Sequence, residues 1–131
     1  YYICASTPAQ LAALACFTPE ALAVCEARRA EFAARRALVL EGLSHAGLPV
    51  PVQPDGAFYV YIDVRHTGLD SMQFCQRALQ EAHVALTPGH DFGPSSGGAH
   101  VRLSYAASRD DLQEGLARLA AFVAGLKPRH A

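Results

Sequence analysis

Arg102 is the residue of this sequence with the clearest capacity for chemistry. In the run Val-Arg-Leu-Ser-Tyr, strand alternation turns its side chain away from its apolar neighbours Val101 and Leu103. A charged group inside an apolar strand needs a partner or an opening onto a cavity, because burial of an unpaired charge is unfavourable. The planar, permanently charged guanidinium suits two-point binding of a carboxylate. Two interpretations stay open at this stage: an internal salt bridge to Asp or Glu, and a binding site for a ligand that carries a carboxylate.

A glycine-bearing loop, Pro-Gly-His-Asp-Phe-Gly, runs from Pro88 to Gly93 ahead of this strand. It lacks the Gly-Lys-Ser/Thr ending of a phosphate-binding Walker loop, and it is not a dinucleotide fingerprint. His90 and Asp91 are the residue types of an acid–base pair, but the side chains of adjacent residues usually point apart. We interpret the loop as a tight connection that requires glycine backbone angles.

The other residues with chemical capacity form no site pattern. Histidines outside the loop show no metal-ligand spacing, and the sequence contains no serine or cysteine nucleophile motif. The cysteines form no Cys-x-x-Cys pair, so we expect buried free thiols rather than disulfides or a metal site. Because no export signal opens the sequence, we expect a reducing, cytoplasmic location. The four cysteines are Cys4, Cys16, Cys25 and Cys75, of which Cys25 falls on the apolar stripe of an expected helix.

The composition excludes several classes of protein. The chain has 131 residues, of which 51% are hydrophobic and 18% charged, which fits one ordinary domain and excludes intrinsic disorder. A net charge of −1 gives no electrostatic basis for binding nucleic acid or an anionic membrane, and the apolar runs are too short to span a bilayer. Because the sequence opens on Tyr1 and its only methionine is Met72, we expect it to be a piece of a longer protein.

Helices and short strands must position these residues. The expected helices cover residues 9–17, 19 to about 46, 71 to about 82 and 109–126, and the expected strands cover residues 57–63, 84–87 and 100–106. The expected helix caps are Thr7, Thr18, Asp70 with Gln73 as its capping-box partner, and Ser108. Gly47 ends the long second helix, and Lys127 with Pro128 ends the last one. Both faces of the strand at 57–63 are apolar, so we expect it to be covered on both sides.

This order of elements predicts an α/β fold. We expect a two-layer small domain, in which a long N-terminal helix is followed by a small sheet of about three strands packed by helices.

Three motifs occur in order along the chain, with an expected helix between the first two. They are Pro-Asp-Gly-Ala-Phe-Tyr-Val from Pro54, Thr-Pro-Gly-His-Asp-Phe-Gly from Thr87, and His-Val-Arg-Leu-Ser-Tyr-Ala from His100. A further run, Ser-Thr-Pro-Ala-Gln-Leu-Ala-Ala, starts at Ser6. Together with the long arginine-bearing helix and the final leucine-rich helix, this set resembles the C-terminal third of the class I/II pyridoxal-phosphate-dependent aminotransferases, enzymes of fold type I like aspartate aminotransferase. The resemblance covers essentially the whole chain.

The resemblance implies a role for each motif. The arginine of the Val-Arg-Leu-Ser strand binds the substrate α-carboxylate in this family; here that arginine is Arg102, which favours the ligand-binding interpretation. Residues 56–59 are expected in the small domain near the active-site cleft, and the loop at 88–93 is expected to support the substrate-binding strand. The segment at Ser6 and Thr7 is expected near the subunit interface of a homodimer.

The chain departs from the family pattern in one respect. The family's Schiff-base lysine, phosphate cup and pyridinium-nitrogen aspartate belong to a large domain upstream, and the only lysine here is Lys127, in a Pro-Arg tail. A carbonyl cofactor needs a lysine amine held in a formed pocket. The resemblance implies a full-length aminotransferase that uses pyridoxal 5'-phosphate to move an amino group from an amino acid to a 2-oxo acid. Residues 1–131 are expected to be its single C-terminal domain, with no catalytic or cofactor-binding residue, no bound cofactor and no activity alone.

Three alternatives stay open. A C–S lyase would share the carboxylate-binding arginine, and the effector domain of a transcription regulator would share the scaffold but follow a helix-turn-helix segment. A free-standing α/β interaction module is disfavoured by the start without methionine. The sequence indicates neither the amino donor nor the oligomeric state of the isolated segment.

Overall fold

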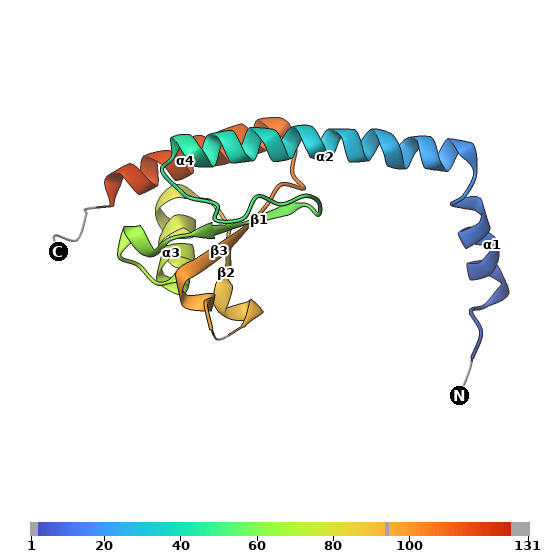
Figure 1. The fold of residues 1–131 in the computed structure, drawn as a ribbon, viewed down its shortest axis with the longest axis horizontal. Coiled ribbons are helices and arrows are strands. Elements are labelled where there is room, and N and C mark those ends of the chain that lie inside the picture. The colour runs from blue at the N-terminus through green and yellow to red at the C-terminus, as the bar shows by residue number, and fades with distance from the viewer. Residues whose placement is uncertain (1–2, 94, 127–131) are drawn as a thin grey trace. The chain divides into compact units, whose positions relative to one another are not determined.

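The structure, a computed structural model, describes residues 3–93 and 95–126. The chain forms two compact units, Tyr1–Phe32 and Ala33–Ala131, and the second unit contains the sheet (Figure 1). The long helix α2 (Pro19–His45) contributes residues to both units. Arg102 and the three motifs that accompany it lie in the second unit.

The first unit contains α1 (Thr7–Ala15) and the start of α2. α1 begins two residues earlier than predicted, with Ser6 rather than Thr7 as its cap. α2 begins where predicted, and the Thr18 hydroxyl accepts a hydrogen bond from the Ala21 amide at 3.3 Å. Among the described residues, no single helix is long and apolar enough to cross a membrane; α1 and α2 meet those criteria only together, and they are bent by 67° at the break.

The expectation of buried thiols is wrong for the cysteines of the first unit. Cys4, Cys16 and Cys25 are exposed, whereas Cys75 in the second unit is buried as expected. Among the described residues of the first unit none is buried, those of α1 included, so this unit does not enclose its own apolar side chains. The large apolar side chains exposed in this unit are Ile3, Leu11, Leu14, Phe17, Leu22 and Val24.

An antiparallel sheet organises the second unit. Its strands are β1 (Tyr59–Asp63), β2 (Thr87–Pro88) and β3 (His100–Ser104), in the spatial order β1-β3-β2. β3 is the central strand and pairs antiparallel with both neighbours. The predicted α/β domain with a small three-stranded sheet is confirmed, although β2 has only Thr87 in common with the strand predicted at residues 84–87.

Helices pack against one face of the sheet. α3 (Ser71–Arg77) contacts β2 and β3, and its continuation, a π-helical turn at Ala78–Ala82, packs against α4 (Arg109–Gly125). The C-terminal part of α2 lies beside α4 (Figure 1), where the absence of a side chain at Gly42 leaves space for Leu116. The core consists of buried apolar side chains that include Val39, Leu43, Val60, Ile62, Phe74, Val101, Leu103, Leu112, Leu119 and Phe122.

Two helix starts in this unit have the predicted caps. The Asp70 carboxylate accepts a hydrogen bond from the Gln73 amide at 2.9 Å, and the Gln73 side chain accepts one from the Asp70 amide at 3.2 Å. These reciprocal bonds complete a capping box. Ser108 Oγ accepts a hydrogen bond from the Asp111 amide at 3.2 Å and begins α4. The predicted end of the last helix at Lys127 lies outside the described residues.

Within the described chain, β1 is covered on one face only. Val60 and Ile62 are buried against the helices, whereas Tyr59 is 40% exposed and Tyr61 is half-buried on the opposite face. The expectation of cover on both faces is therefore wrong for these residues. The apolar character of the second face comes from tyrosine rings, which are amphipathic and can lie partly exposed without a second core.

A buried acid at the end of β1 pairs with an exposed arginine. The Asp63 carboxylate accepts hydrogen bonds from the Arg65 amide at 2.9 Å and from Arg65 Nε at 2.9 and 3.0 Å, and it forms an ion pair with Arg65 Nη2. The guanidinium hydrogen bond is the main reason that the pKa of Asp63 falls from 3.8 to about 2. The pair stabilises the turn that follows β1.

We predict that acid destabilises this unit through Asp63. Its pKa is lower in the folded chain, so its contribution to the free energy of unfolding is present above about pH 4 and is lost as the pH falls through about 2. Because the Arg65 side chain is 71% exposed, solvent screening limits the expected loss to about 1 kcal/mol. Urea unfolding followed by circular dichroism, compared between the wild type and Asp63→Asn across this pH range, measures it. An identical acid dependence in both proteins would contradict the prediction.

Candidate functional site

Arg102 lies in the middle of β3, the central strand. The register places it opposite Tyr61 of β1 and Thr87 of β2. Its neighbours Val101 and Leu103 are buried under the helices, while Arg102 is half-buried on the other face. The predicted alternation is confirmed, and it directs the guanidinium away from the apolar core.

Two aromatic rings and one hydroxyl contact this guanidinium. Arg102 Cζ lies 4.6 Å from the centre of the Phe92 ring and 5.3 Å from the centre of the Tyr59 ring, both within cation–π range. Arg102 Nη2 donates to the Thr87 hydroxyl at 3.4 Å, which is a long and therefore weak hydrogen bond. Arg102 Nε is buried and has no hydrogen-bond partner within the described part of the chain.

Residues 3–93 and 95–126 provide no carboxylate partner for Arg102. Four ion pairs of this region join other arginines to Glu26, Asp63, Glu81 and Glu114. The internal salt bridge that the sequence left open is therefore absent from the described residues. A guanidinium has five N–H donors, so Arg102 keeps donors that are available to a ligand.

The surface around Arg102 is aromatic. Tyr61 stacks on the imidazole of His100, with ring centres 4.9 Å apart and ring planes inclined by 7°. Phe92 meets Tyr61 edge-on, with a centre-to-centre distance of 6.3 Å. We call Tyr59, Tyr61, Phe92, His100 and Arg102 the outer-face cluster, because the strand members lie on the face of the sheet opposite the core.

Sequence reasoning identified Arg102 and missed the rings of the outer-face cluster. Tyr59 and Tyr61 are two residues apart in a strand, so alternation alone was sufficient to place them on one face. Phe92 offers no such signal, because its position depends on how the loop at 88–93 folds back on the sheet.

A close backbone approach positions the turn that carries Phe92. This 3₁₀ turn, Gly89–Phe92, packs against a second one at Gly97–Ala99. A Cβ atom at position 89 would meet the Tyr61 hydroxyl and come within 2.5 Å of the Gly97 carbonyl oxygen. Gly89 is therefore required for space rather than for an unusual backbone angle.

The other residues of the loop do not join the outer-face cluster. His90 and Asp91 are both exposed, and no hydrogen bond joins them in the described structure, so the acid–base pair is not formed. Burial, together with the nearby charge of Asp91, raises the pKa of the Cys75 thiol to about 11, which keeps it protonated and unreactive. Gly93 has a φ of 147°, so the expected need for glycine backbone angles is met at this position.

Tyr105 connects the first motif to the third. Its hydroxyl donates a shared hydrogen bond to the carbonyls of Gly56 and Ala57, at 3.2 Å each. Its amide donates to the Phe58 carbonyl at 2.8 Å. These bonds fix the chain that leads into β1, and with it the ring of Tyr59 beside Arg102.

Two further sequence predictions concern residues outside this cluster. Ser6 and Thr7 belong to the first compact unit, and the cluster belongs to the second. Lys127 lies outside the described residues, which contain no lysine. Nothing in the described residues therefore fits the attachment of an aldehyde cofactor through a lysine amine. They also contain no cluster of three or more side chains able to hold a metal ion.

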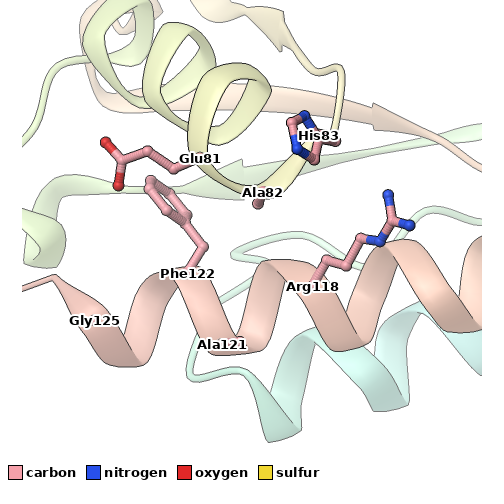
Figure 2. Close-up of a pocket in the computed structure, with 7 residues that line it drawn as sticks. All are labelled: Glu81, Ala82, His83, Arg118, Ala121, Phe122 and Gly125. Carbon is pink, nitrogen blue, oxygen red and sulfur yellow. The ribbon is translucent and has the colours of Figure 1, made fainter.

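A separate hollow of about 520 Å³ lies between α4 and the π-helical turn that follows α3 (Figure 2). Its lining includes Glu81, His83, Arg118 and Phe122. Arg118 pairs with Glu114 at 2.5 Å and Glu81 pairs with Arg77 at 2.6 Å, each one helical turn away. Because these charges are neutralised by neighbours on their own helices, the hollow does not require a ligand.

Comparison with known proteins places the chain in one family. The sequence model of the family described as aminotransferase class I and II matches residues 1–119. The valine–pyruvate aminotransferase of Mycobacterium tuberculosis is 40% identical over 123 residues, which cover 94% of this chain and 32% of that protein. The chain thus spans between about a quarter and a third of the length of the curated relatives it matches.

Solved structures agree with this assignment. An aminotransferase from Mycobacterium tuberculosis superposes with a TM-score of 0.87 at 40% identity, over 95% of this chain and 32% of that one. An aromatic aminotransferase from Pyrococcus horikoshii gives a TM-score of 0.82 at 39% identity, over 86% of this chain and 30% of that one.

We predict that Gly89→Ala destabilises the loop beside Arg102. The added methyl group would displace the Tyr61 hydroxyl or the Gly97 carbonyl, and the free energy of unfolding should fall by about 1–3 kcal/mol. Gly98→Ala is the matched control, because a Cβ there lies 3.5 Å from the His90 ring, an ordinary contact. Urea unfolding of both variants measures the difference, and equal stability would contradict the close-approach argument.

Proposed function

Because the chain belongs to the aminotransferase class I and II family, we propose that it forms the small C-terminal domain of a pyridoxal-phosphate-dependent aminotransferase. In this proposal the parent enzyme transfers an amino group from an amino acid to a 2-oxo acid, and Arg102 binds the α-carboxylate of both. A homodimeric, cytoplasmic parent that binds neither nucleic acid nor membrane belongs to the same proposal, as does a large domain N-terminal to this chain.

The observation that carries the proposal is the unsatisfied guanidinium of Arg102. It has a buried Nε without a partner, one weak bond to a hydroxyl, and no carboxylate partner among the described residues. A carboxylate that approaches the edge of the guanidinium can accept two parallel, charge-assisted hydrogen bonds. The aromatic surroundings lower the local dielectric constant, so these bonds are stronger than they would be in water.

The carboxylate is the group that the two substrates share. An amino acid and a 2-oxo acid differ at the carbon next to the carboxylate, where the amino group is lost or gained. In both substrates the reacting carbon is therefore bonded to the carboxylate that Arg102 binds, and a fixed carboxylate places this carbon at the same position in the site. Positioning of this kind is a large part of enzymatic rate enhancement, because it removes the entropy of alignment from the reaction step.

The cofactor chemistry belongs to another part of the parent protein. Members of this family use pyridoxal phosphate, and the described residues do not fit it, because they include no lysine. The contribution of this chain is substrate binding. The relatives reported above are named aminotransferases, which supports amino-group transfer over the C–S cleavage that the sequence left open.

We predict that Arg102→Lys in the full-length protein lowers kcat/KM for both the amino acid and the 2-oxo acid by about 10- to 100-fold, because one ammonium cannot reproduce a two-point contact. Steady-state kinetics measure this loss. Arg118→Lys is the control, since Arg118 pairs with Glu114 on the surface of α4, and its kinetics should equal those of the wild type. Unchanged kinetics for Arg102→Lys would reject the role of Arg102.

We also predict that residues 1–131 alone bind no pyridoxal phosphate. The single lysine of the chain follows the last helix in a Pro-Arg tail, where no formed pocket is expected. Titration with the cofactor should give no saturable visible absorbance band of a lysine-bound species. A stoichiometric band that disappears in Lys127→Ala would overturn this prediction.

A further inference from the structure

We propose that Phe92 and Tyr59 are positioning residues, whose rings hold the guanidinium of Arg102 in a fixed plane ready for a carboxylate. This inference rests on the proposed function of Arg102 and extends it to two residues of other segments. Phe92 comes from the turn before β3, and Tyr59 is the first residue of β1.

Hydrogen bonding alone does not fix this guanidinium. An arginine side chain carries about 2 kcal/mol of rotamer entropy, which opposes any single orientation. Within the described residues, the hydrogen bond assigned to Arg102 is the contact from Nη2 to Thr87 at 3.4 Å, at the limit of a useful bond. Nε has no partner among those residues.

The two rings supply the missing constraint. Arg102 Cζ lies over the face of each ring, at 4.6 Å from the centre of Phe92 and 5.3 Å from that of Tyr59. A guanidinium over a ring face is held by attraction between its charge and the ring quadrupole, and its N–H edges stay available to a carboxylate. A hydrogen-bonding partner would instead occupy the donors that a ligand needs.

Phe92 lies where its ring adds little to the stability of the hydrophobic core. The residue is 51% exposed, so it contributes little to the core. Its ring nevertheless contacts two groups, Arg102 and the edge of Tyr61. The backbone approach at Gly89 and the stacking of Tyr61 on His100 hold the turn in place beneath it. The local structure therefore presents a large apolar ring to a cation at the surface of the sheet.

The test uses the full-length enzyme and two variants of Phe92. Phe92→Leu removes the ring face and retains an apolar side chain, whereas Phe92→Tyr retains the ring. The probes are butanoate and butanamide as competitive inhibitors, because they differ in the carboxylate alone. Phe92→Leu should raise the inhibition constant of butanoate by about 3- to 30-fold and leave that of butanamide unchanged. Phe92→Tyr should give the inhibition constants of the wild type. Equal weakening of both inhibitors, or a parallel loss of thermal stability that accounts for it, would indicate a merely structural role and overturn the proposal.

A double-mutant cycle separates this inference from the proposed function. If Phe92 acts through the guanidinium, Phe92→Leu should have no further effect on butanoate in an Arg102→Lys background. Additive losses would overturn the positioning role. If Arg102→Lys alone leaves butanoate binding unchanged, the proposed function fails. If Arg102→Lys weakens butanoate and Phe92→Leu does not, the positioning role fails and the proposed function stands.

Discussion

The structure around the site depends on one constraint, a permanent charge on the central strand of a small sheet. The residues paired with Arg102 across the sheet are Tyr61 and Thr87, and neither can neutralise it. The core face is closed to a guanidinium, because Val101 and Leu103 fill it with apolar atoms. The guanidinium must therefore project from the opposite face of the sheet, where aromatic rings rather than carboxylates surround it.

This constraint explains why three distant motifs converge. The segment before β1 is tied to the end of β3 by the hydrogen bonds of Tyr105, which fixes Tyr59. The glycine turn brings Phe92 to the same surface through the close packing at Gly89. The helices on the other face supply the rigid support, since α3 packs against β2 and β3, α4 packs against the turn that continues α3, and the alternate residues of β1 and β3 are buried. The residue types of each motif are thus explained by the contacts that the motif makes around Arg102.

Features that depend on neighbouring residues in the sequence could be predicted from it. Burial and contacts that depend on how distant segments pack could not. The capping box at Asp70, the cap at Ser108 and the alternation that turns Arg102 away from the core follow from residues within a few positions of one another, and all are confirmed. Burial of Cys25 was predicted from a helical stripe, but a stripe says nothing about whether a second layer covers it. Spacing alone equally left the partner of Arg102 undecided, because any of the acids of the chain was available to it until the fold placed them elsewhere.

The same reasoning limits what a carboxylate anchor can select. A guanidinium between rings distinguishes a carboxylate from a neutral group, because only the charged group recovers its lost hydration through paired hydrogen bonds. The guanidinium does not distinguish substrates by their side chains, because the side chain extends from the carbon beyond the bound carboxylate. The similar relatives carry different names, valine–pyruvate aminotransferase for one and aromatic aminotransferase for another, although both match this region at 39–40% identity. Under the proposed function, Arg102 and its rings thus recognise the substrate class, and the choice of amino acid depends on other contacts.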